Sequence, residues 1–334
     1  MIRLHVPGFT SSAGGPRWGD AQILDDGKRH LVIDGYDTQG TDILISVLKE
    51  RKIKSPYLLI THPHYDHYYG IRKIIQSSVF SPKRLYVPNP ESYGDVSSEV
   101  RGNKSVLRSI IAEAKERNIP VTYLRNEQQV TIGEMRFVVY QDTDASYDGN
   151  SEGYVNDRSL AFWFPELSYL TTGDAGMWAV EHYGIKPKMI KCGHHGNNIG
   201  TNSIKPSVMA PRLKRNGCLY YWDNDFSTTL TDFLMTGRED AQNAGMIILG
   251  IHGDINAIWF GKRCVIYKGS NLYRYACSYA GKANLKSADL AIVKAVINGK
   301  TGAGDARISC LLNKGYNAGA VQKEVNEIVK AIKG

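Results

Sequence analysis

The sequence has few cysteines and no long apolar run. Its five cysteines in 334 residues are an odd number at wide, irregular spacing, which argues against a disulfide framework and against a cysteine-based zinc knuckle. The densest apolar stretch, residues 246–251, is far too short to cross a bilayer, so no membrane span is predicted. We expect reduced, mostly buried thiols at Cys192, Cys218, Cys264, Cys277 and Cys310.

Residues 1–15 lack the basic segment, apolar stretch and small-residue cleavage site of a secretory signal. We therefore expect a soluble protein that is cytoplasmic as made. Acidic residues are in deficit, because 41 Lys and Arg against 33 Asp and Glu give a net charge of +8. This mild basic excess favours a polyanionic partner such as nucleic acid, teichoic acid or an anionic wall, without choosing among them.

Strands alternate with helices through about 200 residues, a pattern typical of an α/β domain. Apolar residues at helical spacing predict helices over residues 41–51, with Thr41 as N-cap, and over residues 105–117. A buried strand over residues 57–60 leads directly into His62. Further strands are predicted over residues 29–34, 84–87, 136–140, 160–164, 169–172 and 188–192.

The C-terminal part of the chain has a different pattern. A polar, glycine-containing stretch over residues 278–286 is typical of a linker. It separates a first domain, residues 1–277, from residues 287–334, where the pattern predicts a small three-helix domain. Its helices are expected over residues 287–298, 305–314 and 319–332, around a core of Leu290, Val293, Ile297, Leu311, Leu312, Val321, Val325 and Ile328.

Residues 61–70, Thr-His-Pro-His-Tyr-Asp-His-Tyr-Tyr-Gly, are the segment richest in metal-binding side chains. Imidazole and carboxylate groups are the ligands that zinc prefers where cysteine is absent. Because Pro63 disfavours both strand and helix, we expect these ligands on a loop at the carboxyl end of a strand, where open α/β sheets place their sites. A solvated polar loop is the alternative, but three of the nine histidines within six positions make it the weaker one. The candidate ligands here are His62, His64, Asp66 and His67.

His-x-His-x-Asp-His after an apolar strand resembles the signature of the metallo-β-lactamase superfamily, which implies an αβ/βα sandwich with the metals at one sheet edge. Residues 170–176, Leu-Thr-Thr-Gly-Asp-Ala-Gly, resemble the family element in which an aspartate, here Asp174, bridges two metals. Residues 190–196, Ile-Lys-Cys-Gly-His-His-Gly, resemble the element that supplies the last ligand. Either His194 or His195 fits that role, and we favour His195, with His194 as a proton donor beside it. The resemblance covers roughly residues 1–270 and includes a hairpin at residues 32–35.

The resemblance implies a binuclear site and a hydrolytic reaction. Two zinc ions, with manganese or iron as alternatives, would lower the pKa of a shared water from about 15.7 toward about 7 and so make hydroxide available. Asp66 would orient this nucleophile as well as bind metal, and His194 would protonate the leaving alkoxide. The ligands implied are His62, His64, Asp66, His67, Asp174 and His195.

One family ligand is missing from the sequence. Hydrolytic lactamases and glyoxalase-like members have a further histidine between the first motif and the Gly-Asp element, but here no histidine lies between His67 and His182. That ligand position is then either open to water or filled by another residue, for which Asn156 and Asp157 are the candidates. The order Asn-Asp-x-Ser-Leu, Thr-Gly-Asp, His-His-Gly is similar to a branch that includes competence-type DNA-uptake hydrolase domains and cell-surface phosphorylcholine esterases. That branch implies an anionic phosphoester substrate.

Other polar and aromatic residues are candidate substrate contacts. Trp222, beside three Asp and Asn residues, could stack a base or hold a quaternary ammonium group. His252 lies in an expected turn, where a structural role is the alternative. The tyrosines at residues 65, 68 and 69 are explained more simply by packing. The substrate-binding candidates are Asn156, Trp222 and His252.

Residues 287–332 resemble the cell-wall-binding repeat at the C-termini of some phage lysozymes and endolysins, although Ala303 stands where such repeats often have Asn. The resemblance implies binding of peptidoglycan fragments, and a helical cap that merely packs on the enzyme is the alternative. A single repeat would bind weakly unless the protein oligomerises. The candidate wall-binding residues are Gly302, Gly304, Asp305 and Arg307.

Together these motifs predict a metal-dependent phosphodiesterase directed to bacterial cell-wall material, acting on teichoic acid or its phosphoester substituents. We expect it to act at the cell wall after release by lysis or non-classical export. One alternative is a nuclease or nucleotide phosphodiesterase that resembles the DNA-uptake hydrolase domain, which the basic charge mildly favours. A second alternative is a non-catalytic wall-binding protein. The presence of all five motif residues speaks against it, since an inactive site has no physical reason to keep them all. These residues are His62, His64, Asp66, His67 and Asp174.

Overall fold

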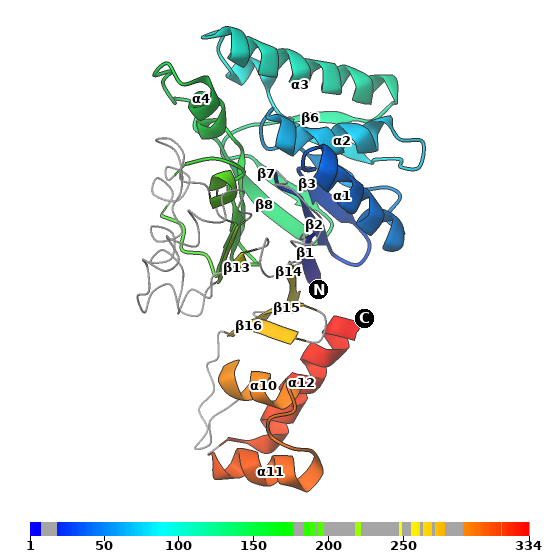
Figure 1. Cartoon of the computed structure of the whole chain (residues 1–334), viewed down its shortest axis with the longest axis vertical. Coiled ribbons are helices and arrows are strands. Elements are labelled where there is room, and N and C mark those ends of the chain that lie inside the picture. Colours follow the sequence, from blue (N-terminus) through cyan, green and yellow to red (C-terminus); the bar gives the residue numbers. More distant parts are fainter. Residues whose placement is uncertain are drawn as a thin grey trace.

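The computed structural model describes residues 1–7, 19–176, 184–191, 193–196, 218–221, 247–248, 255–260, 263–268, 271–277, 290–314 and 316–333. The expected linker, residues 278–286, and the candidate contacts Trp222 and His252 lie outside these residues. The described chain forms two β-sheets with helices beside them and a group of C-terminal helices (Figure 1). The predicted α/β sandwich with C-terminal helices is thereby confirmed.

The first sheet combines antiparallel and parallel strands. From β3 to β6 its strands are parallel, and its other neighbouring strands are antiparallel. Its order across the sheet is β16 (Asn271–Cys277), β15 (Arg263–Lys268), β14 (Ile255–Phe260), β1 (Ile2–Val6), β2 (Gln22–Asp25), β3 (His30–Ile33), β4 (Tyr57–Leu59), β5 (Arg84–Pro88) and β6 (Val121–Leu124).

The second sheet is antiparallel from β7 to β10 and parallel from β10 to β13. Its order is β13 (Ile247–Ile248), β12 (Cys218–Tyr221), β11 (Met189–Lys191), β10 (Tyr169–Thr171), β9 (Ala161–Phe164), β8 (Met135–Tyr140) and β7 (Gln129–Ile132). Strands were predicted at β3, β4, β5, β8, β9, β10 and β11, within one or two residues of where they lie.

The two sheets pack face to face around one apolar core. The ring centroids of Tyr169, on β10, and Trp259, on β14, lie 5.8 Å apart. Polar contacts cross the same interface, because Gln22 Nε2 donates to Thr171 Oγ1 at 2.9 Å and Trp259 Nε1 donates to the Leu167 carbonyl at 2.7 Å. These bonds satisfy buried polar groups that would otherwise cost free energy between the sheets.

Four helices lie within roughly the first 160 residues of the described chain, a length typical of one domain. They are α1 (Thr38–Glu50), α2 (Tyr65–Gln76), α3 (Ser98–Glu116) and α4 (Ser151–Asp157), with short 3-10 segments η2 (Pro90–Ser92) and η3 (Gly193–Gly196). Helices α1 and α2 lie side by side, beside the first sheet (Figure 1). Two predicted helix starts are wrong by several residues. Helix α1 begins before Thr41, whose Oγ1 donates to the Gly35 carbonyl, and α3 begins after Ser97, whose Oγ accepts from Val100 N.

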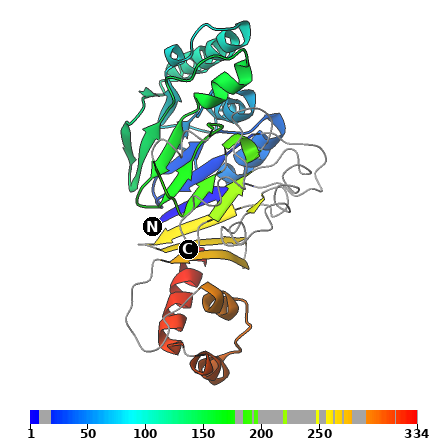
Figure 2. The same ribbon diagram turned by 90° about the vertical axis from the view of Figure 1, so that its left-hand side faces the viewer.

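The C-terminal helices are α10 (Leu290–Ile297), α11 (Gly304–Asn313) and α12 (Ala318–Lys333). They lie beyond β16 in both views, and α10 contacts that strand (Figures 1 and 2). Of the predicted core, Val293, Leu311, Val321 and Val325 are buried. Leu312 is not, since 49% of its surface is exposed on the outer side of α11. The core gains instead Ile292, Val296 and Tyr316.

Candidate metal centre

The first histidine motif lies where β4 passes into α2. His62 and His64 are on the connecting loop, and Asp66 and His67 are in the first turn of α2. The expectation that all four lie on a loop is therefore wrong for the last two. The helix begins at Tyr65, beyond Pro63, so the proline does not interrupt it. An acidic side chain in the first turn, here Asp66, also favours a helix start.

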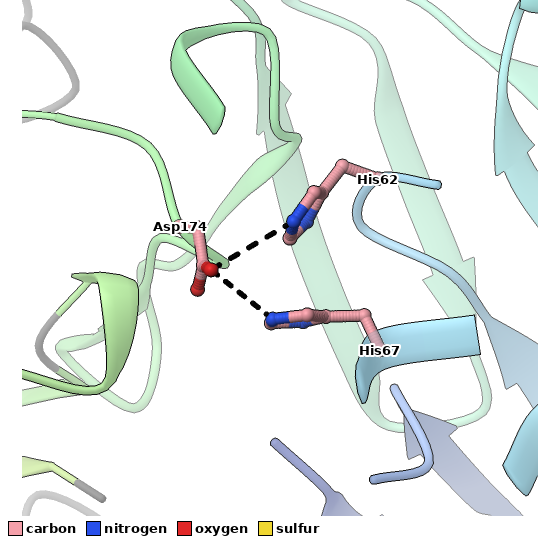
Figure 3. Close-up of side chains that lie close together, drawn as sticks. All are labelled: His62, His67 and Asp174. Atoms are coloured by element: carbon pink, nitrogen blue, oxygen red, sulfur yellow. Dashed lines mark ion pairs between the residues drawn. The ribbon is translucent and has the colours of Figure 1, made fainter. Parts of the chain in front are cut away.

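Three of the predicted ligands converge on one buried point. His67 Nε2 lies 3.2 Å from Asp174 Oδ2, and His62 Nε2 lies 3.7 Å from the same oxygen. One donor atom from each of these three residues lies within 4.8 Å of the other two. Both imidazoles point toward the carboxylate, which comes from the other sheet (Figure 3). This set has the donor types and spacing of a site for a divalent cation.

The other two motif residues extend this cluster on either side. His64 Nδ1 lies 3.1 Å from His62 Nε2, and Asp66 Oδ2 lies 3.8 Å from His67 Nε2. His62 and His67 are fully buried, whereas His64 and Asp66 are half-buried. The motif thus provides a fully buried pair of donors beside Asp174, His62 and His67, and a half-buried pair, His64 and Asp66.

Asp34, which directly follows β3, supports this cluster through hydrogen bonds to Thr61 and His67. Its Oδ1 accepts from Thr61 N at 2.8 Å, and its Oδ2 accepts from Thr61 Oγ1 at 2.8 Å and lies 2.9 Å from His67 Nδ1. A ring nitrogen held in this way directs the opposite nitrogen, Nε2, toward a metal. The residues present therefore fit a divalent cation. Residues 32 and 33, which were expected in an opening hairpin, lie in the second strand of the β2–β3 hairpin, whose turn is at residues 26–29.

The charge balance of the cluster favours a cation. Burial holds the pKa of His62 well below its ordinary value, and the neighbouring His67 and His64 lower it further. Burial also disfavours charge on His67, but Asp174, Asp66 and Asp34 outweigh it and raise the pKa of His67 well above its ordinary value. Positive charge on the His67 ring is thus stabilised by three carboxylates, with Asp34 at Nδ1 and Asp66 and Asp174 at Nε2. A metal would occupy the same place in competition with that proton.

The second histidine pair is only partly described. His194, in η3, is half-buried with a positive φ of 48°, and its Nε2 lies 3.6 Å from Glu152 Oε1. Interaction with His194 lowers the pKa of Glu152. Glu152, at the start of α4, had no signal in the sequence that could have found it. The side chain of His195 lies outside the described part, so its role as a ligand stays a prediction.

Asn156 lies at the end of α4 and is 2% exposed. Its Oδ1 is buried, and among the described residues it has no hydrogen-bond partner. This orphaned acceptor keeps Asn156 as a candidate for a ligand or substrate contact. Its role also stays a prediction.

The candidate wall-binding residues lie at the start of α11. Gly302 and Gly304 have positive φ values of 75° and 53° and are exposed, as is Asp305. Arg307 Nε donates to the Gly302 carbonyl at 3.0 Å, and its Nη1 donates to Gln322 Oε1, on α12, at 2.9 Å. Arg307, which lies on α11, thus connects the glycine turn before this helix with α12. In the part of the chain that the structure covers, none of the helices could span a membrane.

Two parts of the chain match models of known protein families. Residues 19–176 match the model of the metallo-beta-lactamase superfamily, and residues 290–329 match the model of the CW_7 repeat. No curated protein matches the sequence.

Three solved structures that match this chain share little sequence with it. Igni18, a metallo hydrolase from Ignicoccus hospitalis, has a TM-score of 0.49 at 12% identity, over 77% of this chain and 100% of its own. A diphosphatase from the PhnP family has a TM-score of 0.48 at 15% identity, over 78% of this chain and 99% of its own. The rubredoxin oxygen:oxidoreductase of Desulfovibrio gigas has a TM-score of 0.34 at 14% identity, over 51% of this chain and 39% of its own.

Proposed function

Because this chain carries a metallo-beta-lactamase superfamily domain and a C-terminal CW_7 cell-wall repeat, we propose that it is a metal-dependent phosphodiesterase directed to bacterial cell-wall material. The observation that carries the proposal is the presence, in one chain, of the buried His62, His67 and Asp174 cluster and a wall repeat. The substrate is an anionic phosphoester of the wall, such as teichoic acid or its substituents.

The residues that would hold the metal are His62, His67 and Asp174 at depth, joined by His64, Asp66 and His195. A bound divalent metal supplies hydroxide near neutral pH by lowering the pKa of a water molecule, and it stabilises charge on phosphoryl oxygens. Zinc, in two copies, is the metal that we propose, with manganese and iron as alternatives.

The protein's own groups then orient the reactants. Asp34 and Thr61 keep His62 and His67 directed toward Asp174. Asp66, half-buried beside His67, orients the attacking water and accepts its proton. As the new phosphorus–oxygen bond forms and the ester bond breaks, His194 donates a proton to the leaving alkoxide. Glu152, 3.6 Å from His194 Nε2, holds that imidazole at the site.

The repeat would keep the enzyme on its polymeric substrate. Residues 302–307 form its proposed peptidoglycan-binding surface, with Gly302, Gly304, Asp305 and Arg307 near the sugar-peptide chain. One repeat gives weak binding on its own, so oligomerisation would strengthen retention by multivalency.

The net charge of +8 favours one alternative, a nuclease or nucleotide phosphodiesterase. Such an enzyme would cleave single-stranded DNA and leave wall polymer intact. A non-catalytic wall-binding protein would bind less than one metal ion per chain and hydrolyse no phosphodiester.

The test compares hydrolysis of bis(p-nitrophenyl) phosphate, p-nitrophenyl phosphorylcholine and nitrocefin by the wild type and by Asp174→Ala. We expect phosphodiester turnover that falls by roughly 100-fold or more in the variant, because a shared metal ligand is lost. Asp42→Ala, which removes an exposed carboxylate from α1, is the matched control and should turn over normally. Two results would contradict the proposal: hydrolysis of nitrocefin but of neither phosphodiester, or no hydrolysis of any of the three substrates by a protein that has bound metal.

A further inference from the structure

A buried lysine lies directly behind the candidate metal centre. Lys191, the last residue of β11, is 1% exposed and forms an ion pair with Asp20, which is 4% exposed. Its Nζ also donates to the Gly173 carbonyl at 2.9 Å and lies 3.8 Å from Asp174 Oδ1. A buried ammonium group is costly unless it is paired and hydrogen-bonded, so this lysine needs a physical explanation.

The sheet register places Lys191 at this point. Strands β10 and β11 are parallel, with Thr171 opposite Lys191, so both carboxyl ends meet at the same edge. The chain then turns at Gly173, whose φ is +54° and where an added Cβ would lie 2.9 Å from Thr61 Cβ. This close approach brings the turn before Asp174 over the lysine and against the histidine motif at once.

The two oxygens of Asp174 consequently face different partners. Oδ2 faces the imidazoles, 3.2 Å from His67 Nε2 and 3.7 Å from His62 Nε2. Oδ1 faces Lys191, at 3.8 Å. The Lys191 ammonium group thus lies between Oδ1 of Asp174 and the carboxylate of Asp20, and the Gly173 carbonyl accepts a hydrogen bond from it.

We propose that Lys191 is a positioning residue for the metal centre: it holds the Asp174 carboxylate so that Oδ2, and not both oxygens, is offered to metal. Asp20 acts through Lys191 by keeping its ammonium group in place. The inference rests on the proposed metal site, and it adds a residue pair to which neither the motif nor the ligand set assigns a role.

The competing explanation is that Lys191 merely balances the buried charge of Asp20. A second buried lysine offers a comparison. Lys104, on α3, is 5% exposed and pairs with Glu91 at 3.0 Å and Asp95 at 3.2 Å. It touches none of the candidate ligands in the described structure, so its removal reports the cost of losing a buried lysine without the metal centre.

The experiment measures Co²⁺ binding to the full chain by chelator competition, together with the visible absorption spectrum of the bound Co²⁺ and the midpoint of urea unfolding without metal. The variants are Lys191→Met, Lys191→Met with Asp20→Asn, and Lys104→Met. The double variant removes both charges of the buried pair, so it should recover stability that the single variant loses.

We expect both Lys191 variants to bind Co²⁺ roughly 10- to 100-fold more weakly, with an altered spectrum, as for loss of a group that orients a ligand. Lys104→Met should keep the wild-type affinity and spectrum. If the double variant binds Co²⁺ with the wild-type affinity and spectrum, the proposed role of Lys191 is overturned, while the proposed metal site still stands. If the wild type itself binds no Co²⁺, the proposed metal site fails, and the role of Lys191 fails with it.

Discussion

Asp34 lies beneath the candidate metal centre, at the carboxyl end of β3, and its carboxylate touches two other segments of the site. It is fully buried and has a positive φ of 57°, a conformation uncommon for a residue other than glycine. The backbone strain is compensated by the bonds to Thr61 and His67. Burial raises the pKa of Asp34, while His67 and the Thr61 amide oppose that rise. Its role depends on accepting hydrogen bonds at both oxygens.

Asp34→Asn should weaken metal binding by roughly 10- to 100-fold. The amide can still accept from Thr61, but its NH₂ group would face His67 Nδ1 and favour the tautomer that carries its proton on Nε2. Chelator competition with Zn²⁺ measures the loss. Asp42→Asn, an exposed control on α1, should bind like the wild type. Equal affinity in both variants would show that Asp34 does not orient the imidazole.

At the scale of elements, helix α2 must lie very close to the loop after β3. Gly35 N donates to the His67 carbonyl at 2.8 Å, and an added Cβ on Gly70 would lie 1.9 Å from the Gly35 carbonyl oxygen. This contact is between backbone atoms and leaves no room for a side chain. It is also what allows Asp34 to reach His67, so the packing of α2 and the geometry of the metal centre are coupled.

Gly70→Ala should therefore destabilise the protein by about 1–3 kcal/mol, because the backbone must move apart to admit the methyl group. Metal affinity should fall as well, since His67 moves with α2. The control is Gly102→Ala, at an exposed position of α3 where an added Cβ meets nothing within 4 Å. It should stabilise the helix by up to about 1 kcal/mol. Urea unfolding of the two variants compares them directly, and equal midpoints would refute the close-packing argument.

At the scale of the whole molecule, the described residues include a large apolar core and a smaller one that is separate from it. The large core lies between the sheets, and the small one joins α10, α11 and α12 through Ile292, Val293, Leu311 and Val321. Separate cores are what independently folding domains require. We therefore keep the division into residues 1–277 and residues 287–334 as a proposal.

Removal of residues 287–334 should leave Zn²⁺ binding and phosphodiester turnover unchanged and abolish retention on purified peptidoglycan. Sedimentation with peptidoglycan, followed by assay of both fractions, measures the two properties together. The full-length Asp174→Ala variant should show the reverse: it should sediment with the wall and fail to turn over. Loss of metal binding on truncation would mean that the helices are part of the hydrolase domain.

Local patterns in the sequence determined much of this protein. Apolar runs and turn residues predicted the strands that carry the site, and helical spacing predicted α10, α11 and α12, because these features depend on neighbours a few residues apart. The metallo-β-lactamase and wall-repeat resemblances, which depend on short ordered motifs, are confirmed by the family matches. The spacing of the histidine motif also identified the residues that converge with Asp174.

Only the tertiary structure decided which residues support that motif. Asp34 meets His67 across 33 residues, and Lys191, in the second sheet, meets Asp20, which precedes β2 of the first. Glu152 meets His194 because the start of α4 lies near η3. Local sequence patterns cannot predict such pairs, because the pairs depend on strand register and on the close approach of backbones that are far apart in the sequence. Two predictions are wrong for the same reason: residues 65–67 form the start of α2 where a loop is predicted, and Leu312 is exposed where a core position is predicted. In both cases tertiary packing, and not the local pattern, determines the outcome.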